Sequence, residues 1–216
     1  MSDSSSLVTA EHFRYIAERT TREDAFLADL KRAAASEGIP PIWVAPEQAS
    51  LMQILLRLHG ARDVVEVGTL AGYSAIAMAR ALPEGGLVRT IELNPKHAEF
   101  ARRWVARSDV APRVVVHVGG GMEILPGFAP ASADAAFLDA DKGSYPLYLE
   151  QCLRIVRRGG LIMADNAFAF GQLLDPHATD REVPAVRAFN DVMAREQRLQ
   201  SVIVPIGDGL WVGVKR

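Results

Sequence analysis

Five short apolar runs, each followed by a segment with helical periodicity, constrain the fold of this chain more than any other feature. The runs DVVEVG, LVRTIEL, RVVVHVG, DAAFLDA and GGLIMADN have the composition and length of buried strands. Strands that alternate with helices pair in parallel, and the crossover helices cover both faces of the sheet. The ending differs, because LQSVIVPIGDGLWVGVKR places two strand patterns around a Gly-Asp-Gly turn. We therefore expect an α/β fold with a doubly wound, mostly parallel sheet of seven strands that closes with an antiparallel hairpin.

Additional helices precede this repeat. Apolar residues at helical spacing predict two helices within residues 10–36, with Thr20 or Thr21 as the cap between them. The stretch GIPPIWVAPEQ contains three prolines and predicts a loop, followed by a helix over residues 46–58. The expected architecture is thus a Rossmann-like sheet with extra N-terminal helices.

The composition is that of an ordinary globular protein, with 49% apolar and 23% charged residues in a chain of 216. We expect a single domain over residues 1–216, with residues 1–8 flexible and residues 9–45 forming the N-terminal helices and loop. The formal net charge of -2 gives no electrostatic reason to expect a nucleic-acid or membrane partner. The first residues have no signal-peptide pattern, and the lone Cys152 excludes an intrachain disulfide, so we expect a cytoplasmic protein.

Polar residues and glycines follow the predicted parallel strands at their carboxyl ends. In an open sheet of this kind, ligands bind beyond these ends, near the point where the strand order reverses. The residues at such positions are Glu66, Gly68, Glu92, Gly119 to Gly121, Asp139 to Lys142, Asp165 and Asn166. We expect them to converge on one rim of the sheet.

The segment VVEVGTLAGYS predicts a binding site for a nucleoside cofactor. It runs from a buried strand through Gly68 and Gly72 into a helix, so backbone N–H groups can approach a ligand closely. The spacing of these glycines is not the G-x-G-x-x-G of a pyrophosphate site. Glu92 ends the second strand, where an acidic side chain accepts hydrogen bonds from ribose hydroxyls. Glu66 lies inside an apolar run and would pair with a cationic amine of the ligand, and Ser74 could hydrogen-bond a carboxylate of the same ligand tail.

A second site is predicted from two aspartates and an asparagine. Asp139, Asp165 and Asn166 offer two carboxylates and an amide carbonyl, the hard oxygen ligands that suit Mg²⁺. Residues 139 and 165 flank one crossover helix, so neighbouring parallel strands would place them side by side. The alternative is that the Asp165–Asn166 pair is a turn or helix cap, an ordinary use of that dipeptide.

The segments EVGTLAGYS, TIELNP, FLDADKGSY, MADN and PIGDGL together resemble the class I, metal-dependent O-methyltransferases that use S-adenosylmethionine (SAM). This family contains catechol O-methyltransferase and caffeoyl-CoA O-methyltransferase, and the preceding helices look like those of its small bacterial members. The resemblance covers the chain from about Pro41 to the C-terminus. It implies the following cofactor contacts: Glu66, Gly68, Thr69, Ser74 and the backbone near Val44 for the methionine portion, Glu92 for the ribose, and Gly120, Gly121 and Asp141 for the adenine side or the amine.

The same resemblance implies the chemistry. A divalent cation, Mg²⁺ or another such as Mn²⁺ or Ca²⁺, would bind Asp139, Asp165 and Asn166, and Lys142 would take the proton of the acceptor as general base. A phenolic hydroxyl has a pKa near 10 by analogy with tyrosine, and coordination to a cation favours its anion. We therefore expect methyl transfer to a small ortho-dihydroxy aromatic by a homodimeric enzyme.

Two segments depart from the family pattern. The stretch NAFAFGQLL, which begins at Asn166, stands where many relatives carry an aromatic-rich stretch with Trp. The identity of the methyl acceptor is therefore not inferred from the family. VGGGMEILP has three glycines, which leaves the adenine contacts open. The alternatives are a methyltransferase acting on a hydroxylated RNA base, a nicotinamide-dependent oxidoreductase, and a non-catalytic cofactor-binding homologue.

Overall fold

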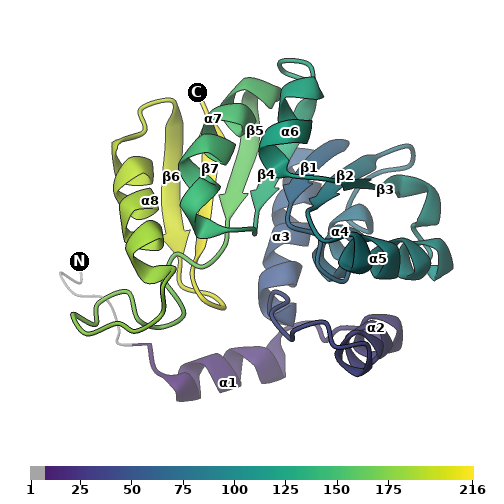
Figure 1. Cartoon of the computed structure of the whole chain (residues 1–216), viewed down its shortest axis with the longest axis horizontal. Helices are drawn as coiled ribbons and strands as arrows, with labels where there is room; N and C mark the ends of the chain where they lie inside the picture. Colours follow the sequence, from purple (N-terminus) through teal and green to yellow (C-terminus); the bar gives the residue numbers. More distant parts are fainter. Residues whose placement is uncertain (1–7) are drawn as a thin grey trace.

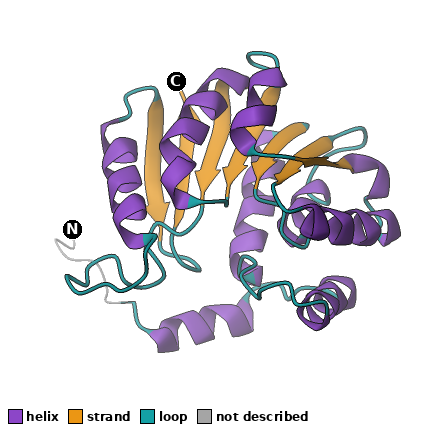
Figure 2. Cartoon of the chain, in the orientation of Figure 1, coloured by secondary structure: helices purple, strands orange, loops and turns teal. Residues whose placement is uncertain are grey.

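A seven-stranded sheet with helices on both faces organises the chain in the computed structural model, which describes residues 8–216 (Figures 1 and 2). The strand order is β3-β2-β1-β4-β5-β7-β6, and the pairs β5–β7 and β7–β6 are antiparallel whereas the other neighbouring strands are parallel. The strands are β1 Asp63–Val67, β2 Leu87–Glu92, β3 Val114–Val118, β4 Ala133–Leu138, β5 Val156–Ala164, β6 Leu199–Val204 and β7 Leu210–Lys215. The predicted fold class is confirmed.

Eight α-helices accompany the sheet within residues 8–216. They are α1 Ala10–Arg19, α2 Ala25–Ser36, α3 Pro46–His59, α4 Tyr73–Ala79, α5 Pro95–Arg107, α6 Gly121–Ile124, α7 Tyr145–Ile155 and α8 Val183–Arg195. Short 3₁₀ turns occupy Ala111–Arg113, Leu125–Gly127 and Lys142–Ser144. No helix in this part of the chain combines the length and apolar character that crossing a membrane requires.

The N-terminal helices form where the apolar spacing predicts them. Thr20 ends α1, and Asp24 begins α2 by accepting a hydrogen bond from the Leu27 amide at 2.9 Å. The predicted threonine cap between the two helices is thus the C-terminal cap of α1 at Thr20, whereas the carboxylate of Asp24 satisfies a free amide at the start of α2. The expectation of a flexible segment at residues 1–8 lies, except for its last residue, outside the described residues, and the single-domain assignment stays a prediction.

Alternating side chains of the central strands bury two separate cores. Val64, Phe137 and Met163 face the first core, which α2, α3, α4 and α5 cover. Val67 and Leu138 face the second core, which α7 and α8 cover. Successive side chains of a strand point to opposite faces, so a strand buried on both sides reads as one apolar run. This is why the five parallel strands could be recognised from the sequence.

The C-terminal hairpin brings its turn to the same rim as the parallel strands. Because β7 is antiparallel to β5 and pairs Trp211 with Ala164, β7 begins where β5 ends. The β6–β7 turn, defined here as residues 207–209, therefore lies beside the segment that follows β5. In Figure 1 this rim faces downward, toward α1, which has no buried residue.

Candidate active site

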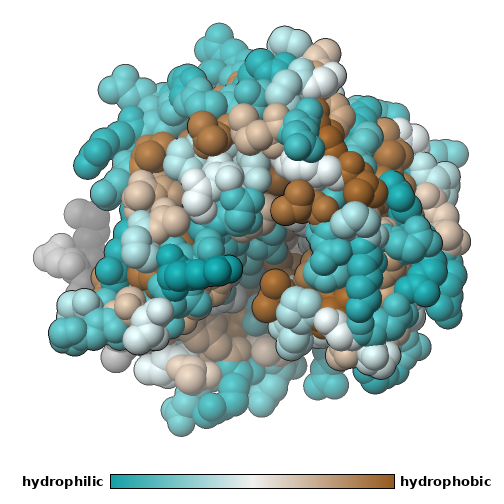
Figure 3. All heavy atoms as spheres, viewed as in Figure 1, coloured by the Kyte–Doolittle hydropathy of each residue, from teal (hydrophilic) through white to brown (hydrophobic). Residues whose placement is uncertain are grey.

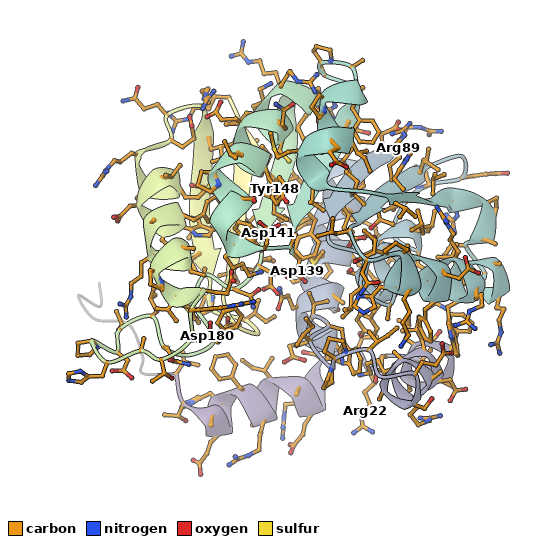
Figure 4. The ribbon with its side chains drawn as sticks, in the orientation of Figure 1. Arg22, Arg89, Asp139, Asp141, Tyr148 and Asp180 are labelled. Carbon is orange, nitrogen blue, oxygen red and sulfur yellow. The ribbon has the colours of Figure 1, made fainter. Side chains whose placement is uncertain are left out.

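The backbone continues the sheet by one residue beyond several strands, which sets the floor of the site. The Asp139 amide donates to the Val67 carbonyl at 2.8 Å, and the Asp165 amide donates to the Leu138 carbonyl at 3.0 Å. Gly68 donates in the same way to the Ile91 carbonyl at 2.9 Å. The side chains singled out in the sequence therefore meet at one rim, as Figure 4 shows for Asp139 and Asp141 near the middle of the molecule.

Asp139 and Asp165 form a pair of neighbouring carboxylates, of which Asp165 is buried and Asp139 keeps 20% of its side chain exposed. Asp165 is 7% exposed, and its Oδ1 accepts a hydrogen bond from Gln48 Nε2 at 2.6 Å. Burial, with the nearby Asp139 charge, raises the pKa of Asp165 to about 7. Burial also raises the pKa of Asp139, an effect that the neighbouring Lys142 ammonium opposes. Both pKa values are raised because the neighbouring protein groups do not fully compensate two negative charges at this place.

Asn166 follows Asp165 with a positive φ of 64°, and its Nδ2 donates to Asp208 Oδ2 at 3.1 Å. The set Asp139, Asp165 and Asn166 fits a hard divalent cation because it joins two poorly compensated carboxylates to an amide oxygen. Among residues 8–216 no three or more His, Cys, Asp or Glu side chains form a metal-binding group. The predicted set contains two carboxylates only, and its third ligand is an amide.

Lys142 is a buried residue of the site, with 6% of its surface exposed. Its Nζ lies 3.2 Å from Asp139 Oδ1 and donates to the Tyr145 hydroxyl at 2.7 Å. The Tyr145 hydroxyl in turn donates to the Leu138 carbonyl at 3.0 Å. The Lys142 amide donates to Glu182 Oε2 at 3.0 Å, so both ends of the residue are held. The amine is thereby fixed beside the carboxylate pair.

Glu66 is fully buried on β1 and has an unused hydrogen-bonding atom. Its Oε1 accepts from Ser74 Oγ at 2.5 Å, whereas Oε2 has no partner. Burial raises the pKa of Glu66 to about 8. A cationic amine would supply the missing partner. Ser74 spends its single proton on Glu66, so it orients this carboxylate and does not donate to a ligand carboxylate in this arrangement.

The turn after β1 approaches the end of β4 very closely. Gly68 has a φ of 101°, and a Cβ at this position would overlap the Asp139 carbonyl. The next two amides bind Glu92, whose Oε2 accepts from Thr69 at 3.2 Å and from Leu70 at 2.7 Å. Glu92 thus supports the turn, and at 8% exposure little of its surface is open.

The predicted adenine side lies where β3 ends and α7 passes. Asp141 Oδ1 accepts from the Tyr148 hydroxyl at 2.7 Å (Figure 4), and a Cβ at Gly121 would press on the Tyr148 ring. The Gly120 amide donates to Glu123 Oε2 at 3.1 Å, so it is already paired. Val44 is buried, with 4% exposure, in the loop before α3.

The stretch NAFAFGQLL forms a tight loop over the end of the sheet. Ala169 and Phe170 have positive φ values of 53° and 58°, and Phe170 keeps 41% of its surface exposed. The Phe168 ring packs against Gly209. The space-filling view shows a hollow near the middle of the face drawn in Figure 1, bordered by hydrophilic and hydrophobic residues (Figure 3).

Five residues of the site were not predicted: Gln48, Tyr145, Tyr148, Glu182 and Asp208. Tyr145 could have been found, because it follows Lys142 by three residues at the start of a predicted helix. Asp208 was assigned only to a turn. Gln48 has no local signal, since its partner Asp165 is 117 residues away in the chain.

Comparison with known proteins agrees with this geometry. A family model described as O-methyltransferase matches residues 17–216. The chain is 37% identical over 204 residues to the catechol O-methyltransferase of Niastella koreensis, covering 93% of this chain and 90% of the relative.

Two solved structures are similar as well. The O-methyltransferase from Bacillus cereus in complex with SAH is 32% identical, with a TM-score of 0.85 and coverage of 94% of this chain and 96% of that one. The O-methyltransferase TomG from Streptomyces achromogenes, involved in tomaymycin synthesis and solved with SAM, is 32% identical. Its TM-score is 0.81, and the match covers 95% of this chain and 96% of that one. The chain therefore belongs to the O-methyltransferase family and is a SAM-dependent O-methyltransferase.

Proposed function

We propose that this enzyme is a metal-dependent O-methyltransferase that moves the methyl group of SAM to one hydroxyl of a small catechol-type aromatic. The observation that carries the proposal is the pair Asp139 and Asp165 beside the Lys142 amine, at the rim of strand ends where open α/β sheets bind their ligands. Two neighbouring carboxylates of this kind can bind a divalent cation that the reaction requires. Cofactor binding alone would need neither the pair nor the lysine.

Glu66, Glu92 and the turn at Gly68 are the proposed cofactor contacts that have the strongest support. The unpartnered Glu66 Oε2 would accept from the amine of the methionine portion. Gly68 and Thr69 bring backbone close to the same place, and Ser74 holds Glu66 in position. The cofactor supplies an activated methyl group on its sulfonium, so the protein mainly positions the two reactants.

The remaining proposed contacts lie around this centre. Glu92 would accept from the ribose while its other hydrogen bonds hold the turn. Gly120, Gly121 and Asp141 border the adenine side, where the Tyr148 ring and hydroxyl limit the space. Val44, in the loop before α3, would contribute its backbone to the methionine portion of the cofactor.

Asp139, Asp165 and Asn166 are the proposed metal ligands. When bound, a divalent cation favours the deprotonated form of a phenolic hydroxyl and directs it. Asp139 links this site to the proton acceptor, because its Oδ1 lies 3.2 Å from Lys142 Nζ. Lys142, in its neutral form, would take the proton from the hydroxyl group that receives the methyl group. Tyr145 would hold the Lys142 amine in position for this step.

The catechol class of acceptor rests on two supports. Adjacent hydroxyls give a substrate two oxygens for one cation, which fixes its orientation. The Niastella koreensis relative is named catechol O-methyltransferase. The loop at residues 167–173 differs from the pattern of many relatives, so we propose the ortho-diol and no particular ring substituent.

Methyl transfer to caffeic acid, catechol and a mono-phenol, with Mg²⁺ and with EDTA, tests this proposal. The wild type should methylate the two ortho-diols only, and EDTA should abolish the reaction. Asp165→Ala should lose transfer while binding SAM, and Lys142→Met should lower kcat by about 100-fold to 10,000-fold. Transfer that persists in EDTA would refute the metal mechanism.

An inactive but SAM-binding wild type would direct the search to a hydroxylated RNA base, the alternative acceptor. The homodimer and the cytoplasmic location stay predictions. Light scattering of the purified protein would decide the first, and fractionation of the source cells the second.

A further inference from the structure

The β6–β7 turn contacts Asn166 directly and reaches Asp165 through the Gln48 side chain. Asp208 Oδ2 accepts from Asn166 Nδ2 at 3.1 Å. Gly207, with a φ of 56°, packs so tightly against the Gln48 side chain that a Cβ would overlap its Oε1. Gln48 Nε2 donates to Asp165 Oδ1 at 2.6 Å. One turn, far from the pair in sequence, thus contacts one proposed metal ligand, Asn166, and the hydrogen-bond partner of a second, Asp165.

The Asp208 carboxylate holds the loop that follows Asn166 as well as the Asn166 side chain. Its Oδ2 also accepts from the Phe170 amide at 2.8 Å, and its Oδ1 accepts from the Gly171 amide at 3.1 Å. The Phe168 amide donates to the Asp208 carbonyl at 2.8 Å, which adds a backbone contact. The turn and the loop are therefore joined by side-chain and backbone hydrogen bonds.

This loop needs an external constraint because its backbone is unusual. Asn166, Ala169 and Phe170 have positive φ values of 64°, 53° and 58°. Residues with a Cβ rarely adopt this region, and surrounding contacts must maintain it. The two Asp208 hydrogen bonds to the amides of residues 170 and 171 supply such contacts.

An ionised carboxylate only accepts hydrogen bonds, so it fixes which face of an amide it meets. Asp208 must face the Asn166 NH₂ group, which leaves the Oδ1 atom of Asn166 available for another partner. Without Asp208 the amide could rotate and present NH₂ to a cation.

We propose that Asp208 is a positioning residue of the metal site, which orients Asn166 so that its carbonyl oxygen serves as a ligand. The inference rests on the metal site of the proposed function. Outer hydrogen-bond partners of metal ligands commonly change metal affinity by about 10-fold to 100-fold when removed.

Mn²⁺ binding to the full chain, measured by electron paramagnetic resonance without SAM, tests the inference. Asp208→Ala removes all three carboxylate contacts, whereas Asp208→Asn keeps one oxygen for Asn166 and Phe170. Asp175→Asn is the matched control, because Asp175 is an exposed carboxylate that caps His177 in the same loop region. Titrations in about 1 M KCl, where the Debye length is about 3 Å, suppress through-space effects of the lost charge.

The expected order of affinity is wild type, then Asp208→Asn, then Asp208→Ala, with the last about 10-fold or more weaker and Asp175→Asn unchanged. Equal affinity of folded Asp208→Ala and wild type would overturn the inference and leave the proposed metal site standing. If Asp208→Ala does not fold, the comparison of Asp208→Asn with Asp175→Asn decides in the same way. A wild type that binds no Mn²⁺ would overturn both the inference and the metal mechanism.

Discussion

Gln48 Nε2 lies 2.6 Å from Asp165 Oδ1, although 117 residues separate the two in the chain. Gln48 is 1% exposed on α3, so its amide has no solvent to bind in place of Asp165. The hydrogen bond lowers the pKa of Asp165 against the larger upward effects of burial and of Asp139. This contact connects the first-core helices to the proposed metal site.

Gln48→Leu should weaken Mn²⁺ binding by about 10-fold, because Asp165 loses the donor that holds one of its oxygens. Gln53→Leu is a matched control, since Gln53 lies on the same helix and donates to the Ala77 carbonyl at 2.7 Å. Isothermal titration with Mn²⁺ would measure both variants. Equal losses in the two variants would show that the Gln48 effect is a general effect on α3.

Glu66 should make the cofactor-free enzyme less stable as pH rises. Its pKa is raised from 4.5 to about 8, so the folded chain holds this proton more tightly than the unfolded chain does. Between these values unfolding releases the proton, and the free energy of unfolding falls with increasing pH. Glu66→Gln should be more stable than the wild type by up to about 4 kcal/mol at pH 7.5, and by little near pH 4.5. Urea denaturation at both pH values measures the difference, which would be constant if Glu66 did not titrate in this range.

SAM binding should release about one proton at pH 7, because a cationic amine next to Glu66 favours the carboxylate that burial disfavours. Calorimetry in buffers of different ionisation enthalpy counts the protons. Glu66→Gln should bind SAM more weakly and release none. An unchanged proton release in that variant would assign the titration to another group.

Tyr145→Phe should lower kcat by about 10-fold without changing SAM affinity, because it removes the hydroxyl 2.7 Å from Lys142 Nζ. The expected loss of stability is about 1 kcal/mol, since the Leu138 carbonyl keeps the Asp165 amide as a donor. Tyr148→Phe, one turn further on α7, removes the donor to Asp141 and should weaken SAM binding instead. Steady-state kinetics with varied SAM separates the two effects, and identical behaviour of the variants would contradict the assignment.

Gly68→Ala should destabilise the fold by about 2 kcal/mol or more, because its positive φ and the overlap with the Asp139 carbonyl both oppose a side chain. Gly127→Ala is the control, since a Cβ there meets nothing within 4 Å. Thermal melting compares the two. A normal melting temperature for Gly68→Ala would show that β1 and β4 can separate at this point.

The five parallel strands, their helices and the rim of polar strand ends follow from the sequence alone. Val64 to Val67 and Ala135 to Leu138 are apolar on both faces except at Glu66, and this pattern is local. Once neighbouring strands are parallel, their carboxyl ends must meet, which brings Asp139 beside Asp165. Glu66 is the one charged residue in the run Val64 to Val67, and a buried carboxylate needs a partner, so the sequence alone marked it as a candidate ligand-binding residue.

The partners of these residues were decided only by the tertiary structure. Gln48 reaches Asp165 because α3 packs on the first core, and Asp208 reaches Asn166 because β7 inserts between β5 and β6. Ser74 donates to Glu66 because α4 starts beside β1. A sequence pattern reports the burial and periodicity of a segment, whereas a hydrogen bond between distant residues depends on how separate elements pack. The types of residue in the site were therefore readable from the chain, and their mutual orientation was set by the packing of the sheet, its helices and the final hairpin.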